Sequence, residues 1–184
     1  FAVLLPQGVF AVAVVRARGG GVMACGAVVS AVMAAVDPSA SVTRVLPDGE
    51  TFAPGDVLAE IEGPASAVLR GERVLLNLLA RMVAVATRTR AYVDAVGGAV
   101  SVATGRQVRV VDTRKTTPGL RALEKHAVTC GGGFNHRYSL SDAVMVKDNH
   151  LTTVTDVTAA LRAAAGRLPH TTHIEVEVDR LEQI

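Results

Sequence analysis

Apolar positions in the first third of the chain come in short runs that turn residues separate. Residues 9–16 are rich in valine and alanine, which predicts a strand, and residues 42–46 predict another short strand. Between them, the apolar run at 21–36 predicts a buried helix. This helix should end at Asp37-Pro38, because a residue that precedes proline disfavours the helical conformation.

A turn-rich segment and then a long amphipathic stretch follow. Asp48-Gly49 and Pro54-Gly55 are turn signals within residues 46–65, so we expect short strands there in a hairpin-like layer. From 67 to 96, apolar residues recur every three or four positions with arginines between them, which predicts a long helix. Because glycine weakens a helix, Gly71 is a point at which this segment can divide into two helices.

The second half of the chain has the spacing of βα units. Its β-rich apolar runs predict three strands, at residues 108–112, 143–147 and 173–178. One helix is expected from an N-cap at Thr117-Pro118 to the glycines at 131–133, and another from about 155 to 165. Strands and helices that alternate in this way predict a parallel sheet and an α/β fold class.

A small, weakly polar segment at 97–105 separates the two patterns. We therefore expect one domain at 1–97, which includes the long helix, and a second domain at 98–184.

The composition is that of a packed globular protein, and it adds two constraints. The chain of 184 residues is 49% hydrophobic and 20% charged, which excludes a disordered chain. Aromatic residues are only 3%, so valine, alanine and leucine must build the core. The net charge of +2 is small, so any affinity for anions must come from local clustering of cations.

Cysteine content and hydropathy indicate where such a chain works. Cys25 and Cys130 are too few and too far apart for a disulfide framework, which favours a reduced, cytoplasmic setting. The apolar run at 21–36 is shorter than the roughly 20 residues that a spanning helix needs. A membrane protein built on this run is an alternative that solubility without detergent would discount.

Positive charge gathers in one part of the second half. Residues 105–150 hold eight Lys and Arg against four Asp and Glu. Lys115 and Lys147 each follow an expected strand, and the carboxyl ends of parallel strands carry the active site in α/β folds. Lys125 instead falls near the end of an expected helix, where a lysine suits the helix dipole, so we expect it to be structural.

Other cations accompany these two lysines. Arg114 follows the first expected strand of the second half, and His136 and Arg137 follow the glycine run. A guanidinium group pairs with carboxylate or phosphate through two parallel hydrogen bonds, whereas an ammonium acts as a point charge. The set therefore favours a ligand that carries more than one carboxylate or phosphate.

Carboxylates are scarce near these cations. Glu175 and Glu177 on the last expected strand share a face, because alternate residues of a strand point the same way. A carboxylate in a cationic site can hold Mg²⁺ or stabilise a developing cation, and periodicity does not decide which glutamate faces the site. The glycine run at 131–133 lacks the phosphate-loop pattern and follows a helix, so a role in ending that helix is favoured.

Four motifs, in this order, resemble those of the nicotinate-nucleotide pyrophosphorylase (carboxylating) family, the quinolinate phosphoribosyltransferases. They are DTRKTTPGLRALEKHAV at 112–128, CGGGFNHR at 130–137, DAVMVKDNH at 142–150 and IEVEVD at 174–179. The segment at 71–96, GERVLLNLLARMVAVATRTRAYVDAV, is similar to the central helices of the family. The resemblance therefore covers essentially the whole chain.

The resemblance implies a fold, a reaction and an assembly. The fold is an N-terminal α/β sandwich domain followed by an α/β barrel domain, here truncated at its C-terminal side. The reaction is phosphoribosyl transfer from phosphoribosyl pyrophosphate to quinolinate with Mg²⁺, which yields nicotinate mononucleotide, pyrophosphate and CO₂ in de novo NAD biosynthesis. The assembly is a homodimer. Because later barrel strands with a second metal-site acid and the 5′-phosphate loops are missing, the chain alone should show weak or no activity.

The resemblance also assigns roles by motif position. The groups that would bind the quinolinate carboxylates are Arg114, His136, Arg137 and Lys147. Thr113 and Lys115 would line the same site, with Lys115 near the phosphates. Arg73 would reach the site of the partner subunit. Glu177 matches the acidic residue near the ribose and the metal, so Lys147 and Glu177 are the expected catalytic pair.

Two other functions stay open. A paralogous phosphoribosyltransferase linked to molybdenum metabolism shares the fold, but Arg114, Arg137 and Lys147 together favour a dicarboxylate. Residues 48–64, DGETFAPGDVLAEIEGP, resemble half of a biotinyl or lipoyl carrier domain. Such a carrier presents a lysine on a tight turn, and Lys115 is the first lysine of this chain, which disfavours a carrier.

Overall fold

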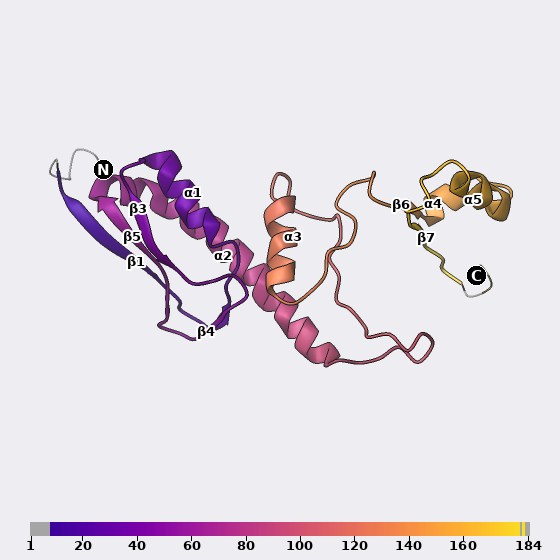
Figure 1. Ribbon diagram of the computed structural model, residues 1–184, viewed down its shortest axis with the longest axis horizontal. Helices are drawn as coiled ribbons and strands as arrows, with labels where there is room; N and C mark the ends of the chain where they lie inside the picture. The colour runs from indigo at the N-terminus through magenta and orange to yellow at the C-terminus, as the bar shows by residue number, and fades with distance from the viewer. Residues whose placement is uncertain (1–7, 181, 183–184) are drawn as a thin grey trace. The chain divides into compact units, whose positions relative to one another are not determined.

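The computed structural model describes residues 8–180 and 182, and the chain forms two compact units. The first unit is Phe1–Asn135 and the second is His136–Ile184. Figure 1 labels most of the helices and strands of each unit along the chain. The domain boundary expected after Gly97 falls inside the first unit, because the helix that follows it packs back on the long helix.

The first unit is built on a three-stranded antiparallel sheet. Its strands are β1 (Phe10–Arg16), β5 (Val57–Pro64) and β3 (Ser41–Val45), with β5 in the centre. A second, two-stranded sheet pairs β2 (Gly21–Val22) with β4 (Thr51–Phe52). The strands expected at 9–16 and 42–46 are thus confirmed. The hairpin-like layer expected within residues 46–65 does not form, because β4 and β5 pair with other strands and not with each other.

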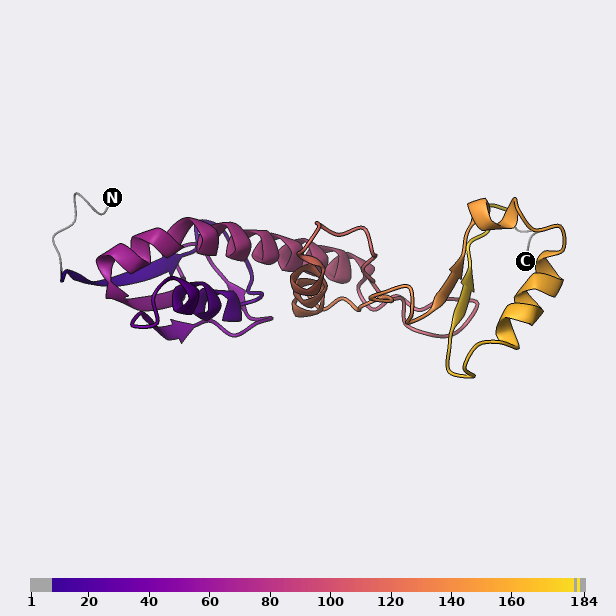
Figure 2. The same cartoon turned by 90° about the horizontal axis from the view of Figure 1, so that it is seen from above.

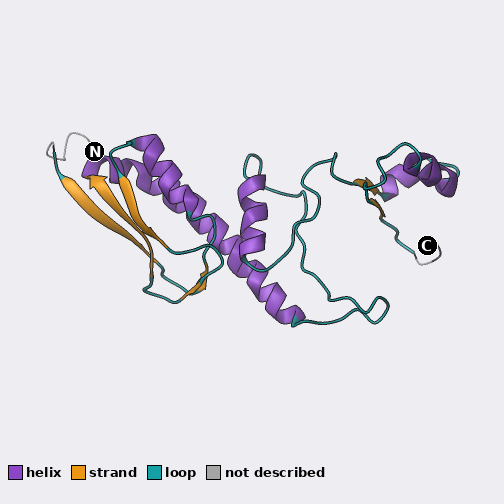
Figure 3. Ribbon diagram, in the orientation of Figure 1, coloured by secondary structure: helices purple, strands orange, loops and turns teal. Residues whose placement is uncertain are grey.

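Two helices, α1 (Ala27–Val36) and α2 (Ala65–Val96), pack on this sheet and on each other. Figure 3 shows both helices beside the antiparallel strands. Met33 of α1, Ile61 of β5 and Leu75 of α2 belong to one buried cluster, so side chains from all three elements form the core. The valine, alanine and leucine that the composition predicts are present in this core, and the methionines Met23 and Met33 and Ile61 join them.

The long helix is continuous through Gly71, so the expected division there is wrong. Gly71 is buried, and a Cβ atom at this position would lie 2.9 Å from Met33 Sδ. The glycine therefore allows α1 and α2 to approach closely, and this packing outweighs its weak helix propensity. The helix ends at Gly97, whose φ of 54° suits the left-handed cap.

The buried segment at 21–36 is helical only from Ala27 onward, so the helix predicted from residue 21 was too long. The preceding backbone finds partners elsewhere: Val22 N–H donates to Thr87 Oγ1 at 3.0 Å and Met23 N–H to Glu50 O at 2.8 Å. Cys25 has a φ of 58°, in the left-handed region, and turns the chain into α1. No helix within the described residues has the length and hydropathy that a membrane crossing requires.

The third helix, α3 (Arg121–Cys130), packs on the second half of α2. It begins after Leu120 and not at the expected cap, Thr117-Pro118, because Thr117 binds the side chain of Glu124 instead. The glycine run ends the helix as expected. A Cβ atom at Gly131 would lie 2.4 Å from Ala86 O, so only glycine fits against α2 there.

The strand expected at 108–112 is absent from the described residues. Its backbone makes a single parallel bridge, Val111 with Phe134, closed by hydrogen bonds from Asp112 N–H to Phe134 O and from Phe134 N–H to Val110 O. A β-strand needs a hydrogen-bonded partner strand along several residues, whereas here only Val111 pairs.

The second unit has a parallel β-α-β order, as expected. The two strands are β6 (Val144–Val146) and β7 (Ile174–Val176), paired in register from Val144 with Ile174 to Val146 with Val176. Between them come α4 (Asp148–Leu151) and α5 (Val157–Ala165). The carboxylate of Asp156 accepts the Ala159 N–H at 2.9 Å and so caps α5. Figure 2 shows β6 and β7 side by side within this unit.

Candidate active site

A buried ion pair supports the loop that carries the first candidate residues. Lys125 of α3 lies with its Nζ 2.5 Å from Asp112 Oδ1, and the two side chains are only 2% and 6% exposed. In the orientation that satisfies its amide, the Asn135 nitrogen donates to Asp112 Oδ2 at 2.6 Å and to Lys125 O at 2.9 Å. Lys125 is therefore structural, as expected, but it is a core residue and not a surface lysine near a helix end.

Two further contacts hold the chain after Asp112 against the helices. Arg121 donates from Nε to Thr116 Oγ1 at 3.1 Å and from Nη2 to Arg114 O at 3.3 Å. Glu124 accepts Thr117 N–H at 3.1 Å and Thr117 O–H at 2.7 Å. The loop from 113 to 117 is thus fixed by side chains of α3.

Glu124 also joins this loop to α2. Arg81 donates to Glu124 Oε1 from Nε at 3.1 Å and from Nη2 at 2.9 Å. Burial acts to raise the pKa of Glu124, but the hydrogen bonds from Thr117 and Arg81 outweigh it, so the pKa lies below the ordinary value. Glu124 is therefore a carboxylate at neutral pH, and it binds both neighbours in that form.

The loop presents three of the expected site residues. The side chain of Arg114 is partly buried, and its Nε is a buried nitrogen without a hydrogen-bond partner among the described residues. Thr113 and Lys115 are exposed, and Thr113 Oγ1 accepts the Lys115 N–H at 3.0 Å. A buried guanidinium nitrogen without a partner is costly, and a carboxylate or phosphate oxygen is its natural acceptor.

Arg73, the fourth expected residue of the first unit, lies on α2 and has a different environment. Its side chain is 85% exposed, and its Nε lies 3.9 Å from Oε1 of the adjacent Glu72. An exposed guanidinium of this kind is free to bind a ligand or another chain.

The second unit brings two expected residues together at the carboxyl ends of its strands. Lys147 directly follows β6 and Glu177 directly follows β7, and Lys147 Nζ lies 3.8 Å from Glu177 Oε2. The parallel pairing continues to this point, since Glu177 N–H donates to Val146 O at 2.8 Å. The register of the sheet therefore places the cation beside the carboxylate.

Two more of the expected site residues, His136 and Arg137, come before β6. His136 Nε2 lies 2.8 Å from Glu175 Oε2. Arg137 donates from Nη1 to Ala143 O at 2.9 Å, and its N–H donates to His136 Nδ1 at 2.8 Å. Glu175 was not among the expected site residues, although its spacing of two from Glu177 placed both on one face. The structure gives each glutamate a cationic or histidine neighbour, so both belong to the candidate site.

The expected residues thus form two groups. Arg73, Thr113, Arg114 and Lys115 belong to the first unit, and His136, Arg137, Lys147 and Glu177 to the second. Each group combines cations with oxygen or nitrogen acceptors, which suits a ligand with several negative charges. That the two groups share one cavity stays a prediction.

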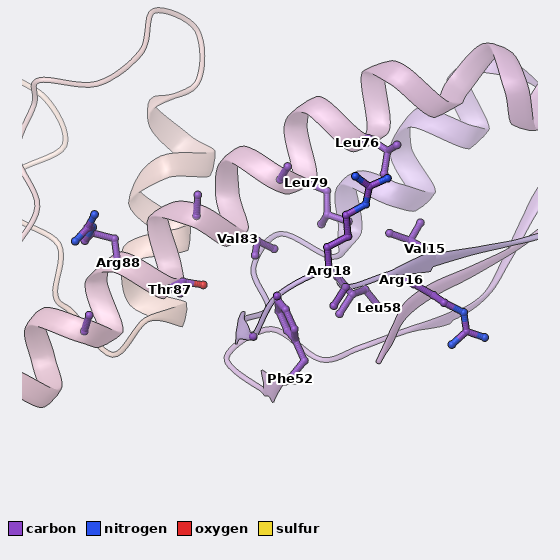
Figure 4. A pocket seen from close by; sticks show the side chains of 16 residues that line it. Val15, Arg16, Arg18, Phe52, Leu58, Leu76, Leu79, Val83, Thr87 and Arg88 are labelled. Atoms are coloured by element: carbon purple, nitrogen blue, oxygen red, sulfur yellow. The ribbon is translucent and has the colours of Figure 1, made fainter. Parts of the chain in front are cut away.

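A cavity of about 610 Å³ in the first unit has another character. It lies between α2 and the strands, and Figure 4 shows Phe52, Leu58 and Val83 among the side chains that line it. Its lining is mainly aliphatic, and none of the expected site residues takes part. Arg16, Arg18 and Arg88 also line it, so the surface is apolar with a few cationic groups.

Comparison with known proteins identifies the two halves of the chain. Residues 1–83 match the N-terminal domain model of quinolinate phosphoribosyl transferase, and residues 85–184 match its C-terminal domain model. The chain belongs to the quinolinate phosphoribosyl transferase family. The two family models meet near residue 84, earlier than the domain boundary expected after Gly97.

Relatives of this family resemble the chain over most of its length. The probable nicotinate-nucleotide pyrophosphorylase [carboxylating] of Bacillus subtilis is 40% identical over 168 residues, which are 91% of this chain and 56% of that protein. The nicotinate-nucleotide pyrophosphorylase [carboxylating] of Homo sapiens is 43% identical over 142 residues, 77% of this chain and 46% of that protein. The chain thus spans about half the length of these curated relatives.

Solved structures from this family resemble the fold of the chain. NadC from Streptococcus pyogenes matches with a TM-score of 0.88 and 37% identity, over 98% of this chain and 63% of that one. The nicotinate-nucleotide pyrophosphorylase of Francisella tularensis matches with a TM-score of 0.86 and 29% identity, over 97% and 61%. The expected α/β fold of the quinolinate phosphoribosyltransferases is therefore confirmed.

Proposed function

We propose that the chain acts in phosphoribosyl transfer from phosphoribosyl pyrophosphate to quinolinate with decarboxylation, which gives nicotinate mononucleotide, pyrophosphate and CO₂ for de novo NAD biosynthesis. Membership of the quinolinate phosphoribosyl transferase family supports the reaction, as do relatives named nicotinate-nucleotide pyrophosphorylase [carboxylating]. The observation that carries the proposal within the structure is the buried Nε of Arg114, which lacks a protein acceptor among the described residues.

The cations have a positioning role in this proposal. Arg114, Arg137 and Lys147, with His136, hold the two carboxylates of quinolinate and so orient its ring nitrogen. Lys115 lies next to Arg114 on the same loop and is exposed, which suits contact with phosphate. Thr113 fixes the backbone of that loop through the Lys115 N–H.

The chemistry then follows from charge. The ring nitrogen forms a bond to ribose C1 as the bond from C1 to pyrophosphate breaks, and Glu177 stabilises the positive charge that develops on the ribose. The 2-carboxylate then leaves as CO₂, the electron pair of the broken bond stays on C2 beside the positively charged ring nitrogen that stabilises it, and C2 takes up a proton to give the product. Lys147, whose Nζ lies 3.8 Å from Glu177 Oε2, offsets the negative charge of the substrate carboxylate that it binds.

Mg²⁺ is the expected cofactor, and the carboxylates present suit it. Mg²⁺ binds through one or two carboxylates together with substrate phosphates. Glu177 is 56% exposed and Glu175, on the same strand, is 43% exposed, so both offer oxygens to solvent. When bound, the ion would offset the charge of the departing pyrophosphate.

A homodimer and a cytoplasmic location complete the proposal. The exposure of Arg73 on α2, at 85%, supports a role in the site of a partner subunit. The two free cysteines, Cys25 and Cys130, support a reducing compartment.

Release of labelled CO₂ tests the reaction. The protein from the whole reading frame that contains this chain would be given phosphoribosyl pyrophosphate, Mg²⁺ and quinolinate labelled at its 2-carboxylate. We expect labelled CO₂ in equal amount to nicotinate mononucleotide. Transfer to another acceptor without release of CO₂ would instead support the paralogous phosphoribosyltransferase.

A further inference from the structure

A second cluster of polar side chains lies in the first unit, apart from the residues assigned to quinolinate. Asp48, His126 and Cys130 place a carboxylate oxygen, an imidazole nitrogen and a thiol sulfur all within 4.8 Å of one another. We propose that these three residues form a binding site for a thiophilic divalent cation of the Zn²⁺ type. This site is distinct from the Mg²⁺ site, and it does not depend on the proposed function.

The helix α3 supplies two of the ligands with a spacing that suits one ion. His126 and Cys130 are four residues apart, so their side chains lie on the same face of the helix, one turn from each other. Two ligands at this spacing on a helix are a recurring arrangement in zinc sites. Cys130 is the last residue of α3.

The third ligand comes from a turn that the sheet holds against this helix end. Gly49, with a φ of 87°, makes the turn after Asp48, and a Cβ atom on Gly49 would lie 3.6 Å from Cys130 O. Asp48 Oδ1 accepts the Gly26 N–H at 2.8 Å, which fixes the carboxylate at the start of α1. Asp48 Oδ2 lies 2.7 Å from His126 Nε2 and is the oxygen that faces α3.

The donor set selects the kind of cation. One thiolate, one imidazole and one carboxylate give a charge of about −2 and the mixed sulfur, nitrogen and oxygen set that Zn²⁺ accepts, whereas Mg²⁺ takes oxygen alone. Bond lengths of roughly 2.0–2.3 Å in a tetrahedron separate ligand atoms by roughly 3.3–3.8 Å. The cluster therefore needs only small side-chain movements, including separation of Asp48 from His126, to close around an ion.

The surroundings of the cluster permit entry and a change of protonation. His126 and Asp48 are 53% and 30% exposed, so an ion can reach them from solvent. An ion bound to His126 Nε2 requires the ring proton to lie on Nδ1, and the thiol proton of Cys130 passes to solvent on binding. The bound ion would join α3 to the turn at Asp48 and thus stabilise the first unit.

Cobalt substitution of the reduced, purified chain tests the site. Co²⁺ bound to a thiolate gives a charge-transfer absorption, and Zn²⁺ then displaces it. We expect one Co²⁺ per chain with this band, its loss in Cys130→Ser, and binding weakened more than roughly tenfold in His126→Ala. The matched control is Cys25→Ala, because the Cys25 thiol instead donates to Leu123 O at 3.5 Å.

Stability gives an independent readout that does not require activity. Zn²⁺ should raise the midpoint of thermal unfolding in the wild type and in Cys25→Ala, but not in His126→Ala, whose exposed position allows normal folding. Absence of the band from the wild type, or its persistence in Cys130→Ser, would overturn the proposal. Loss of the band in Cys25→Ala but not in Cys130→Ser would also overturn it.

Discussion

Lys125 Nζ lies 2.5 Å from Asp112 Oδ1, and both side chains are buried beneath the loop that carries Arg114. The ion pair ties α3 to the residue that precedes Thr113, so it determines where this loop begins. A structural lysine thus supports a site made of other cations.

Loss of one partner of this pair should be costly. In Lys125→Met, the Asp112 charge stays buried without its ammonium partner, and we expect unfolding to become easier by about 3–5 kcal/mol. Urea unfolding measures this difference. The control is Lys115→Met, an exposed lysine on the same loop, which should change stability by less than about 0.5 kcal/mol. Equal losses in the two variants would contradict a special role for the buried pair.

Acid should release the contacts of Glu124. Because the folded state holds the pKa of Glu124 below its ordinary value of 4.5, this group stabilises the fold above that pH. The contribution is lost as the pH falls through the folded-state pKa, when the carboxylate takes up a proton. We expect Glu124→Gln to be less stable than the wild type at pH 7, with the difference narrowing below about pH 4. If the difference in unfolding free energy between the wild type and Glu124→Gln stayed constant from about pH 7 to below about pH 4, Glu124 would not be the titrating group.

Alkali should destabilise the fold through Cys25. Burial, together with the Asp48 carboxylate, raises the pKa of the Cys25 thiol from 9.0 to about 12. A raised folded-state pKa means that the stabilisation is complete below pH 9 and is lost as the pH rises towards 12. The midpoint of thermal unfolding of the wild type should fall over this range more steeply than that of Cys25→Ala. If the midpoint fell equally with pH in the wild type and in Cys25→Ala, the Cys25 thiol would not contribute to the alkaline loss of stability.

Mixed variants test the proposed role of Arg73 in a partner subunit. In the whole protein, Arg73→Ala and Lys147→Ala should each abolish most turnover. If the site is shared, a heterodimer of the two variants keeps one intact site, so an equal mixture should recover about a quarter of wild-type turnover. Subunits must be mixed by co-expression or refolding. No recovery, with heterodimers present, would place Arg73 in the site of its own chain or outside any site.

Local signals in the sequence were sufficient for much of the fold. The valine-rich strand β1, the end of α1 at Asp37 and the cap of α2 at Gly97 follow from propensity and from backbone preferences that act over a few residues. The parallel pairing of β6 and β7 follows from the βα spacing, and this pairing brings Lys147 beside Glu177. The part of the site that depends on strand register was therefore predictable.

Features that depend on distant partners were not predictable in this way. The segment before Ala27 leaves the helix because Thr87 and Glu50, far along the chain, accept its N–H groups. Gly71 stays within one helix because Met33 packs against it. Lys125 is buried because Asp112 lies opposite, and periodicity alone cannot show that a polar position has such a partner. Tertiary contacts outweigh local propensity at each of these places.

Binding of quinolinate by Arg114→Ala tests the central claim most directly. Calorimetry would compare the wild type, Arg114→Ala and the exposed control Arg106→Ala, with quinolinate and with nicotinate, which has one carboxylate fewer. Loss of a charge-assisted hydrogen bond of about 1.5–3 kcal/mol predicts quinolinate binding roughly 10–150-fold weaker in Arg114→Ala, and unchanged in Arg106→Ala. Unaltered quinolinate affinity in Arg114→Ala, or an equal loss in Arg106→Ala, would contradict the account.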